Sequence, residues 1–312
     1  MNPPKKIIDL LKEENNFCLA THIFPDGDTL GAALALAEAL EIMGKDVIAY
    51  NKDKIPTMFD FMPRVNTIKT TIDFNTKEAV LIILDCNSPD RANVDKYTFK
   101  TTAVIDHHLT NSNYGDIQWI SSSTPSTGMM VYYIIKSLGI NLTIDMAVNI
   151  YTTLAVDTGT FRYSNTTAES LKVASELVSI GVRPSFISDY LYNNWREPKF
   201  LLLKNMLSKM EIQNNIAINT VTLEMFNQTG ANKDDTESFV NFPIMVETIK
   251  VSALFREIEK NSWKISLRSR GSFNVAEIAE KLGGGGHKNA AGCRIKGDIK
   301  SAKNILLEAL LY

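Results

Sequence analysis

Four short apolar runs in the first third of the chain constrain its fold more than any other feature. They cover residues 17–21, 47–50, 79–84 and 103–105, and none contains a charged residue. Strands of this kind are buried on both faces, as in parallel sheets covered by other elements. The Ala- and Leu-rich stretch 29–43, closed by Gly44, predicts a helix between the first two runs. The region is therefore predicted to be α/β, with a mainly parallel sheet flanked by helices.

The pattern after residue 126 is mainly helical. Helices are predicted at residues 127–138, 144–154 and 168–180. Thr166, followed three positions later by Glu169, predicts a capping box at the start of the third helix, and Gly181 ends it. These helices would complete the first domain.

A polar stretch at residues 192–198, ending in Pro198, predicts a boundary between two domains. After it, residues 216–223, 250–257 and 263–268 alternate like half-exposed strands, and residues 273–282 predict a helix that runs into four glycines. We therefore expect a first domain at residues 1–192, a linker at 193–210 and a smaller α+β domain at 211–312. A length of 312 residues agrees with two domains.

Composition narrows the class of protein. The net charge of -2 argues against a protein that binds long nucleic acid stably by charge alone. Cys18, Cys86 and Cys293 lie far apart, so neither a disulfide framework nor a cysteine zinc site is expected, and a reducing cytoplasm fits best. Charged residues interrupt the N-terminal apolar stretch, and no run approaches a membrane span, so we expect neither a signal peptide nor a membrane protein.

All four histidines follow a predicted strand or helix and have acidic or glycine-rich neighbours. His22, Asp26 and Asp28 lie between the first strand and the following helix, at the edge where α/β proteins bind ligands. The two carboxylates could face different metal ions, or Asp26 or Asp28 could cap the helix. Asp85 ends the third strand and could bridge two ions or accept hydrogen bonds from loop amides. Taken one by one, these segments leave both interpretations open.

Two further acidic segments extend the set. Asp106, His107 and His108 end the fourth strand, so one imidazole could bind metal while the other faces a substrate, and Asp106 could orient an imidazole from behind. Asp157 ends an apolar helix, where a carboxylate opposes the helix dipole and calls for a compensating cation. A metal ion would supply that charge.

Together these segments predict a dinuclear metal site. Its ligands would be His22, Asp26, Asp28, Asp85, His107 and Asp157. Carboxylates with a minority of imidazoles suit Mn²⁺ or Mg²⁺ better than a thiolate-bound metal. Two such ions about 3.5–4 Å apart can activate water for attack on a phosphate ester.

The glycine-rich segment 283–292 is predicted to bind an anion. Gly284, Gly285 and Gly286 would let backbone N–H groups approach a phosphate, and His287 would add a side-chain donor. Arg268 and Arg270 precede it on a strand and a turn. A flexible tetraglycine loop is the alternative.

These motifs, in this order, resemble the DHH phosphoesterases that carry a DHH-associated C-terminal domain. The resemblance rests on His22, Asp26, Asp28, Asp85, the run 106–108, Asp157 and the glycine motif ending at Gly292, and it spans both domains. The glycine motif distinguishes this branch from the inorganic pyrophosphatases of the family. The compact length resembles the nanoRNase branch, which degrades very short RNA and removes the 3′-phosphate of 3′-phosphoadenosine 5′-phosphate (pAp).

The resemblance implies a role for each residue. One Mn²⁺ would be held by His22, Asp26 and Asp85, and a second by Asp28, Asp85, His107 and Asp157. His108 and Asp85 would act at the scissile phosphate, with Asp106 behind them. Substrate would be bound by His287, the glycines 284–286, Arg268, Arg270 and Asn289, and the active site would lie in the cleft between the domains.

The implied function is hydrolysis of short oligoribonucleotides, dinucleotides and pAp by a cytoplasmic exonuclease, with a homodimer left open. One alternative is a phosphodiesterase acting on cyclic dinucleotides or their linear products. A second, of another class, is a nucleotide sensor without catalysis. The sensor predicts a missing metal ligand, and the sequence contains every one of them.

Overall fold

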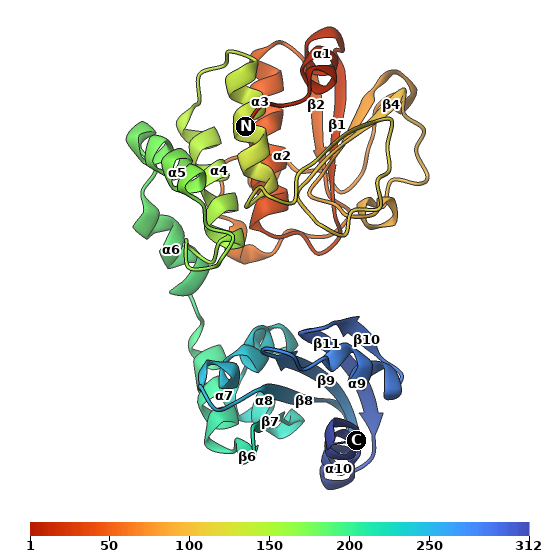
Figure 1. The fold of residues 1–312 in the computed structure, drawn as a ribbon, viewed down its shortest axis with the longest axis vertical. Coiled ribbons are helices and arrows are strands. Elements are labelled where there is room, and N and C mark those ends of the chain that lie inside the picture. Colours follow the sequence, from red (N-terminus) through yellow and green to blue (C-terminus); the bar gives the residue numbers. More distant parts are fainter. Residues whose placement is uncertain (312) are drawn as a thin grey trace. The chain divides into compact units, whose positions relative to one another are not determined.

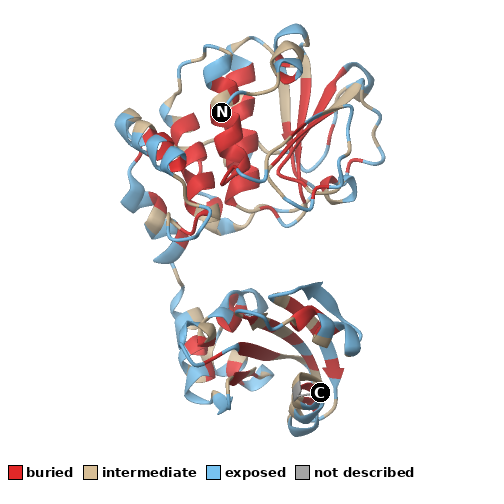
Figure 2. Ribbon diagram, viewed as in Figure 1, coloured by how far each residue is buried: buried red, intermediate tan, exposed pale blue. Residues whose placement is uncertain are grey.

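The computed structural model describes residues 1–311, and the chain divides into two compact units, Met1–Asn194 and Trp195–Tyr312 (Figure 1). Each unit has its own sheet and its own buried core (Figure 2). Among the described residues, no helix is long and apolar enough to cross a membrane. The first unit carries most of the predicted site residues.

The sheet of the first unit has five strands, all parallel, in the order β2-β1-β3-β4-β5. The strands are β1 (Asn16–Thr21), β2 (Asp46–Tyr50), β3 (Val80–Leu84), β4 (Thr101–Asp106) and β5 (Ile117–Ile120). The central strand β3 is buried along its whole length, which explains its unbroken run of apolar residues. Because the strands are parallel, their carboxyl ends lie at one edge of the sheet.

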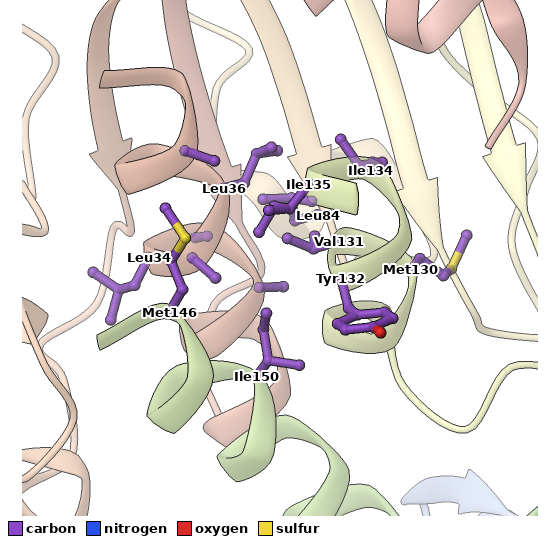
Figure 3. Close-up of a cluster of buried hydrophobic side chains, with 14 of the residues drawn as sticks. Leu34, Leu36, Leu84, Met130, Val131, Tyr132, Ile134, Ile135, Met146 and Ile150 are labelled. Atoms are coloured by element: carbon purple, nitrogen blue, oxygen red, sulfur yellow. The ribbon is translucent and has the colours of Figure 1, made fainter. Parts of the chain in front are cut away.

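Helices cover one face of this sheet. The helices α2 (Gly27–Ile42), α3 (Thr127–Ser137) and α4 (Ile144–Asp157) pack together there, while α1 (Lys5–Glu13), α5 (Ala168–Ile180) and α6 (Pro184–Tyr192) complete the layer. Figure 3 shows Leu34 and Leu36 of α2 beside Leu84 of β3 and apolar side chains of α3 and α4. The opposite face is covered by loops and short 3₁₀ turns, with Ile72, Ala92 and Val94 in a second cluster.

Two glycines of α2 allow a close approach between α2 and α4. A Cβ atom on Gly27 would lie 2.6 Å from a methyl group of Val156, and one on Gly31 would lie 2.6 Å from the carbonyl oxygen of Asn149. Both distances are shorter than real side-chain contacts. The close packing brings the first turn of α2, which contains Asp28, to the last turn of α4, which ends at Asp157.

The second unit has a six-stranded mixed sheet in the order β10-β11-β9-β8-β7-β6. Its strands are β6 (Glu211–Gln213), β7 (Ile216–Val221), β8 (Val251–Glu259), β9 (Ser262–Ser269), β10 (Gly285–His287) and β11 (Ala290–Lys296). Only β7 and β8 pair in parallel among the described strands of this sheet. The helices α9 (Val275–Lys281) and α10 (Ile299–Leu311) contribute to one core, and α7 (Glu197–Ser208) and α8 (Leu223–Thr229) to another.

The predicted fold class is confirmed, a parallel α/β unit followed by a smaller α+β unit. Three local expectations differ from the structure. Most of the segment expected as a linker is the helix α7, whose Leu202 and Met206 are fully buried in the second unit. The capping box of α5 is formed by Thr167 and Ser170, one residue after the expected pair. The predicted glycine loop is partly the strand β10.

Candidate metal centre

The predicted metal ligands of the first unit meet at the carboxyl edge of its sheet. His22 follows β1, Asp85 follows β3 and His107 follows β4, and β3 pairs with both of the other strands. The first turn of α2 adds Asp26 and Asp28, and the last residue of α4 is Asp157. Residues from four separate segments therefore lie together because parallel strands end at the same edge.

Asp85 lies at the centre of this arrangement. Its side chain is 2% exposed, and its oxygens lie 3.6 Å from Nε2 of His22 and 3.4 Å from Nε2 of His107. The backbone of Asp85 has a φ of 54°, in the left-handed region that costs free energy for most residues. Its N–H donates to the carbonyl of Ile105, which holds the residue there. Asp85 thus turns sharply out of β3 and faces both histidines.

Three groups of three side chains have the spacing of metal ligands. The first is Asp85, His107 and His108, and the other two, called the two ligand groups below, consist of the predicted ligands alone. One is His22, Asp26 and Asp85, and the other is Asp28, His107 and Asp157; within each, the candidate ligand atoms lie within 4.8 Å of one another. Adjacent ligands of an octahedral ion at about 2.1 Å lie about 3 Å apart. The oxygens of Asp157 and Asp28 lie 3.0 and 3.5 Å from Nε2 of His107. The donor set therefore fits hard divalent cations.

The outer nitrogens of both histidines have backbone partners. Nδ1 of His22 lies 2.8 Å from the carbonyl oxygen of Ile23, and Nδ1 of His107 lies 3.2 Å from that of Thr124. A carbonyl can only accept, so each Nδ1 carries the proton. In the neutral form of each ring, Nε2 then points its lone pair into the carboxylate cluster, as a metal ligand requires.

Asp106 orients His108 rather than His107. Its fully buried carboxylate accepts from Nδ1 of His108 at 2.7 Å and from Nδ2 of Asn111 at 2.6 Å. The His108 side chain is 35% exposed, so its Nε2 is accessible beside the cluster. The sequence left open which imidazole Asp106 supports, and the hydrogen bonds identify it.

Burial and, after it, repulsion between carboxylates raise the pKa of three carboxyl groups in the cluster. Burial, together with the charges of Asp85 and Asp157, raises the pKa of Asp28 well above its ordinary value. Burial and the charge of Asp85 also raise the pKa of Asp26 to about 6. Burial raises the pKa of Asp157 as well. The folded protein therefore holds more negative charge at this point than it can stabilise alone.

The pKa values of His107 and Asp85 shift the other way. Burial acts to lower the pKa of His107, but hydrogen bonds to Asp157 and Asp85 outweigh it and raise that pKa to about 12. Burial acts to raise the pKa of Asp85, but hydrogen bonds from His107 and His22 outweigh it and lower that pKa. Both shifts result from the negative charge around Nε2 of His107. Either a proton or a metal ion bound to that nitrogen can compensate this charge.

Asp26 caps α2 and is also placed to bind an ion, the two functions considered for it. Its Oδ1 accepts from the N–H groups of Asp28 and Thr29, each at 3.0 Å, and so caps α2. Its Oδ2 lies 3.9 Å from Nε2 of His22. The cap leaves one oxygen free to bind an ion.

The start of α3 supports the cluster, which the sequence interpretation missed. The N–H groups of Thr127 and Gly128 donate to the two oxygens of Asp28 at 2.7 and 2.9 Å. The hydroxyl of Thr127 donates to Oδ1 of Asp85 at 3.0 Å. These donors fix both carboxylates, and the helix dipole favours their charge. The signal available in the sequence was Ser126, which caps α3, directly before two small residues.

We expect the Thr127→Val variant to lose about 10- to 100-fold in kcat/KM for phosphoester hydrolysis, because Asp85 loses the hydroxyl that orients it. Valine matches threonine in shape, so the backbone donors to Asp28 remain. Steady-state kinetics at saturating Mn²⁺ measures the effect. Thr127→Ser, which keeps the hydroxyl, is the matched control, and equal losses in both variants would contradict this role.

In the second unit, Arg268 and His287 lie on one face of the sheet. Ala290 of β11 pairs with His287 of β10 on one side and with Arg268 of β9 on the other. Paired residues of neighbouring strands point to the same face. The small side chain of Ala290 leaves space between the two donors. Next to this row is a hollow of about 500 Å³, whose lining includes Gly284, Gly285 and the cations Lys264 and Arg294.

The glycines and two other predicted residues have structural partners here. A Cβ atom on Gly284 would lie 2.1 Å from the carbonyl oxygen of Gly292, and one on Gly286 would lie 2.5 Å from that of Ala290, so these glycines allow β10 to pack on β11. The Arg270 guanidinium donates to the carbonyls of Ile244 and Glu247. The Asn289 amide donates to Ser269. These contacts within the protein account for the presence of these residues, and no bound ligand is needed to explain them.

Comparison with known proteins supports this arrangement. Residues 16–158 match the N-terminal domain of the DHH family, and residues 213–311 match the DHHA1 domain. The chain is 35% identical over 310 residues to the bifunctional oligoribonuclease and PAP phosphatase NrnA of Thermus thermophilus, covering 97% of this chain and 92% of that protein. It is 27% identical to the protein of the same name in Bacillus subtilis, covering 93% of this chain and 92% of that one.

A solved structure agrees over both units. The exopolyphosphatase-related protein of Bacteroides fragilis has a TM-score of 0.88 and 27% identity, covering 98% of this chain and 94% of that one. The chain belongs to the DHH family and carries a DHHA1 domain after its N-terminal DHH domain. Within that family, it is similar over nearly its full length to proteins named as bifunctional oligoribonucleases and PAP phosphatases.

Proposed function

We propose that this protein hydrolyses short oligoribonucleotides to mononucleotides and removes the 3′-phosphate of pAp at the cluster of the first unit. The observation that carries the proposal is the position of Asp85 between two groups of ligand-spaced side chains. Full-length similarity to relatives named for both activities supports the choice of substrates. The net charge of -2 supports short substrates over stable binding to long nucleic acid.

Six residues would hold two divalent cations. We assign His22, Asp26 and Asp85 to one ion, and Asp28, Asp85, His107 and Asp157 to the other. Carboxylate-rich sites of this kind suit Mn²⁺, with Mg²⁺ or another divalent ion as substitutes. Bound there, the ions would activate water and neutralise charge on the phosphate. Thr127 and the α3 amides hold the carboxylates in place for this task.

His108 would contact the substrate directly, and Asp106 would act through His108. Asp106 holds the proton on Nδ1 of His108, so Nε2 is left to contact the scissile phosphate. If His108 is protonated, Nε2 donates a hydrogen bond to a phosphate oxygen as negative charge develops there. The hydrogen bond from His108 to Asp106, and the charges of Asp85 and Asp106, raise the pKa of His108 despite its burial. A raised pKa favours that protonated form.

The second unit would bind the rest of the substrate. Arg268 and His287 present donors on either side of Ala290, an arrangement that suits a second phosphate group. Burial lowers the pKa of the Arg268 guanidinium, as expected for a partly desolvated cation. We assign Gly284, Gly285, Gly286, Arg270 and Asn289 to the support of this face.

We expect Arg268→Ala to raise KM for pAp about 10- to 100-fold with a small effect on kcat, because the lost contact would be made before and during the reaction alike. Initial rates over a range of pAp concentrations measure both constants. Lys296→Ala removes a cation six residues along β11 from Ala290, about 20 Å away, and is the matched control. Equal effects in the two variants would contradict a specific role for Arg268.

A substrate panel tests the function itself. The protein is incubated with Mn²⁺ and with pAp, a diribonucleotide, a 24-nucleotide RNA or a cyclic dinucleotide, and products are separated by chromatography. We expect fast turnover of pAp and the dinucleotide and slow turnover of the other two. Faster turnover of the long RNA would overturn the choice of short substrates, and preferred turnover of the cyclic dinucleotide would favour the alternative phosphodiesterase. A protein that binds these compounds without turnover would be a sensor.

We also propose that the protein works in the cytoplasm. Cys18, Cys86 and Cys293 are buried and unpaired. Burial raises the pKa of all three thiols, as expected for cysteines that serve as small apolar residues. Localisation of a tagged full-length protein by fractionation tests this proposal.

A further inference from the structure

Phe24 is an exposed aromatic side chain beside the metal centre. It lies in the short loop between β1 and α2, two residues after His22 and two before Asp26, and is 78% exposed. Burying a phenylalanine typically stabilises a protein, so its exposure at this position calls for an explanation. Scattered exposed apolar residues are common and need no cause. The backbone and the surroundings of Phe24 distinguish it from such residues.

The backbone at Phe24 is held in an unfavourable conformation. Its φ is 58°, in the left-handed region that a bulky residue rarely adopts. Pro25 follows it, and a residue before proline normally takes extended backbone. Asparagine or glycine would accept this position with less strain. The loop therefore keeps a phenylalanine where local preferences oppose it.

Hydrogen bonds brace the loop in this conformation. The Phe24 N–H donates to Oδ2 of Asp53 at 2.8 Å, and the Ile23 N–H donates to the carbonyl of Arg91 at 2.8 Å. Asn51 is fully buried and donates to the carbonyl of His22 at 2.8 Å. Its own carbonyl oxygen accepts from the N–H of Asp53. The surrounding structure thus fixes both the ligand loop and the aromatic residue within it.

We propose that Phe24 is a stacking platform for a nucleobase next to the scissile phosphate. This inference rests on the proposed function, because it assigns the base of the same nucleotide substrates. A phosphate between the two ligand groups places its nucleoside within reach of the loop that carries His22 and Asp26. Aromatic rings bind unpaired bases by stacking, which tolerates any base because every base has a π-face. Phe24 would therefore favour nucleotides over simple phosphate esters without selecting a sequence.

An apolar contact with another protein surface is the competing interpretation. Such a contact needs bulk and hydrophobicity, so leucine would replace phenylalanine with little loss. Stacking needs a flat π-surface, so tyrosine or tryptophan would replace it and leucine would not. The two interpretations also differ in substrates, because only stacking requires the base. These differences define the test.

The test compares pAp with its base-free analogue, in which hydrogen replaces adenine while both phosphates remain. We expect Phe24→Ala to raise KM for pAp by roughly 5- to 150-fold, with kcat nearly unchanged. On the base-free analogue, Phe24→Ala and the wild type should have the same kcat/KM. Phe24→Tyr should keep the wild-type KM for pAp. Phe200→Ala, which removes a 61% exposed phenylalanine from α7, is the matched control and should behave as wild type.

Each contrary result has a definite meaning. Wild-type KM in Phe24→Leu, or equal losses on pAp and on the base-free analogue, would overturn stacking in favour of an apolar contact. An active wild type with an unaffected Phe24→Ala variant would overturn this inference alone. A wild type that hydrolyses neither pAp nor a dinucleotide would overturn both the inference and the proposed function.

Discussion

Replacing Asp85 with Asn is expected to lower kcat/KM for pAp and short RNA by at least about 10³-fold at saturating Mn²⁺. Asp85 faces both ligand groups, with oxygens near Nε2 of His22 and of His107. Losing one preorganised charge at an active site costs about 10²–10³-fold in rate, and this charge would serve two ions. The loss should therefore reach the upper end of that range.

Asparagine is the informative replacement at this position. It matches aspartate in size and is one of the few residues that accept a φ near 54°, so the backbone can remain as it is. Its carbonyl oxygen can still accept from the Thr127 hydroxyl. Alanine would change the shape and the strain together with the charge. Loss of activity in Asp85→Asn can therefore be attributed to the missing negative charge.

Kinetics and thermal unfolding of the same preparations test this prediction. Asp95→Asn, at an exposed position of the first unit, is the matched control and should retain wild-type kcat/KM. Near-wild-type circular dichroism of Asp85→Asn would show that the fold is kept. Activity within tenfold of wild type at saturating Mn²⁺ would contradict the central role of Asp85.

The position of the cluster could be predicted from the sequence because few arrangements are compatible with it. Buried parallel strands end at one edge, so the polar residues that follow β1, β3 and β4 had to meet there. His22, Asp85 and His107 are those residues. The excess of acidic side chains at the ends of apolar elements indicated a bound cation. Topology and charge together were sufficient for this part.

The finer contacts depend on tertiary packing, which no local pattern contains. The role of Thr127 requires α3 to begin next to Asp28 and Asp85, which are 99 and 42 residues away in the chain. The partner of Asp106 depends on ring orientation, because His107 and His108 are adjacent and leave the strand in different directions. The absence of a side chain at Gly27 allows α2 to approach Val156 of α4, a contact 129 residues apart in the chain.

The second unit was less predictable for a related reason. The strands β6 and β10 have only three residues each, and the glycine run gave no periodicity, so β6, β10 and β11 were not predicted. Pairing of β10 with β11 depends on the missing side chains at Gly284 and Gly286, a property of contact rather than of propensity. The helix α7 was not predicted because Pro198 was interpreted as part of a boundary between domains. It instead occupies the first turn of that helix, where proline is tolerated.

Removing the divalent ions is expected to abolish hydrolysis and to make the folded protein less stable as the pH rises from about 4 to 6. The pKa of Asp26 is raised to about 6, and those of Asp28 and Asp157 are also raised. A carboxylate with a raised pKa in the folded state contributes stability below its ordinary pKa near 4, and this stability is lost as the pH rises through the folded value. Ions bound at the cluster would compensate the charge and remove the loss.

The other shifted groups do not cancel this trend. The lowered pKa of Asp85 adds stability above pH 4, and that stability is already present across the whole window. The raised pKa of His107 adds stability below its ordinary value near 6.5, which is lost only at higher pH. The Asp26 side chain is 47% exposed, so solvent screens its charge. We therefore expect deprotonation of Asp26 to lower the free energy of unfolding by about 1 kcal/mol, or Tm by about 2–4 °C for a unit of this size.

Thermal unfolding of metal-free protein between pH 4 and 8, with and without Mn²⁺, measures both effects. The gain in Tm from Mn²⁺ should grow with pH, since deprotonated ligands bind the ion and their repulsion is greatest when it is absent. Asp26→Asn is the matched control: its amide oxygen can still cap α2, and the loss of one titrating carboxyl should flatten the pH dependence. Metal-free protein that becomes more stable over this window, or full hydrolysis after chelation, would show that the carboxylates serve the fold and not a cation.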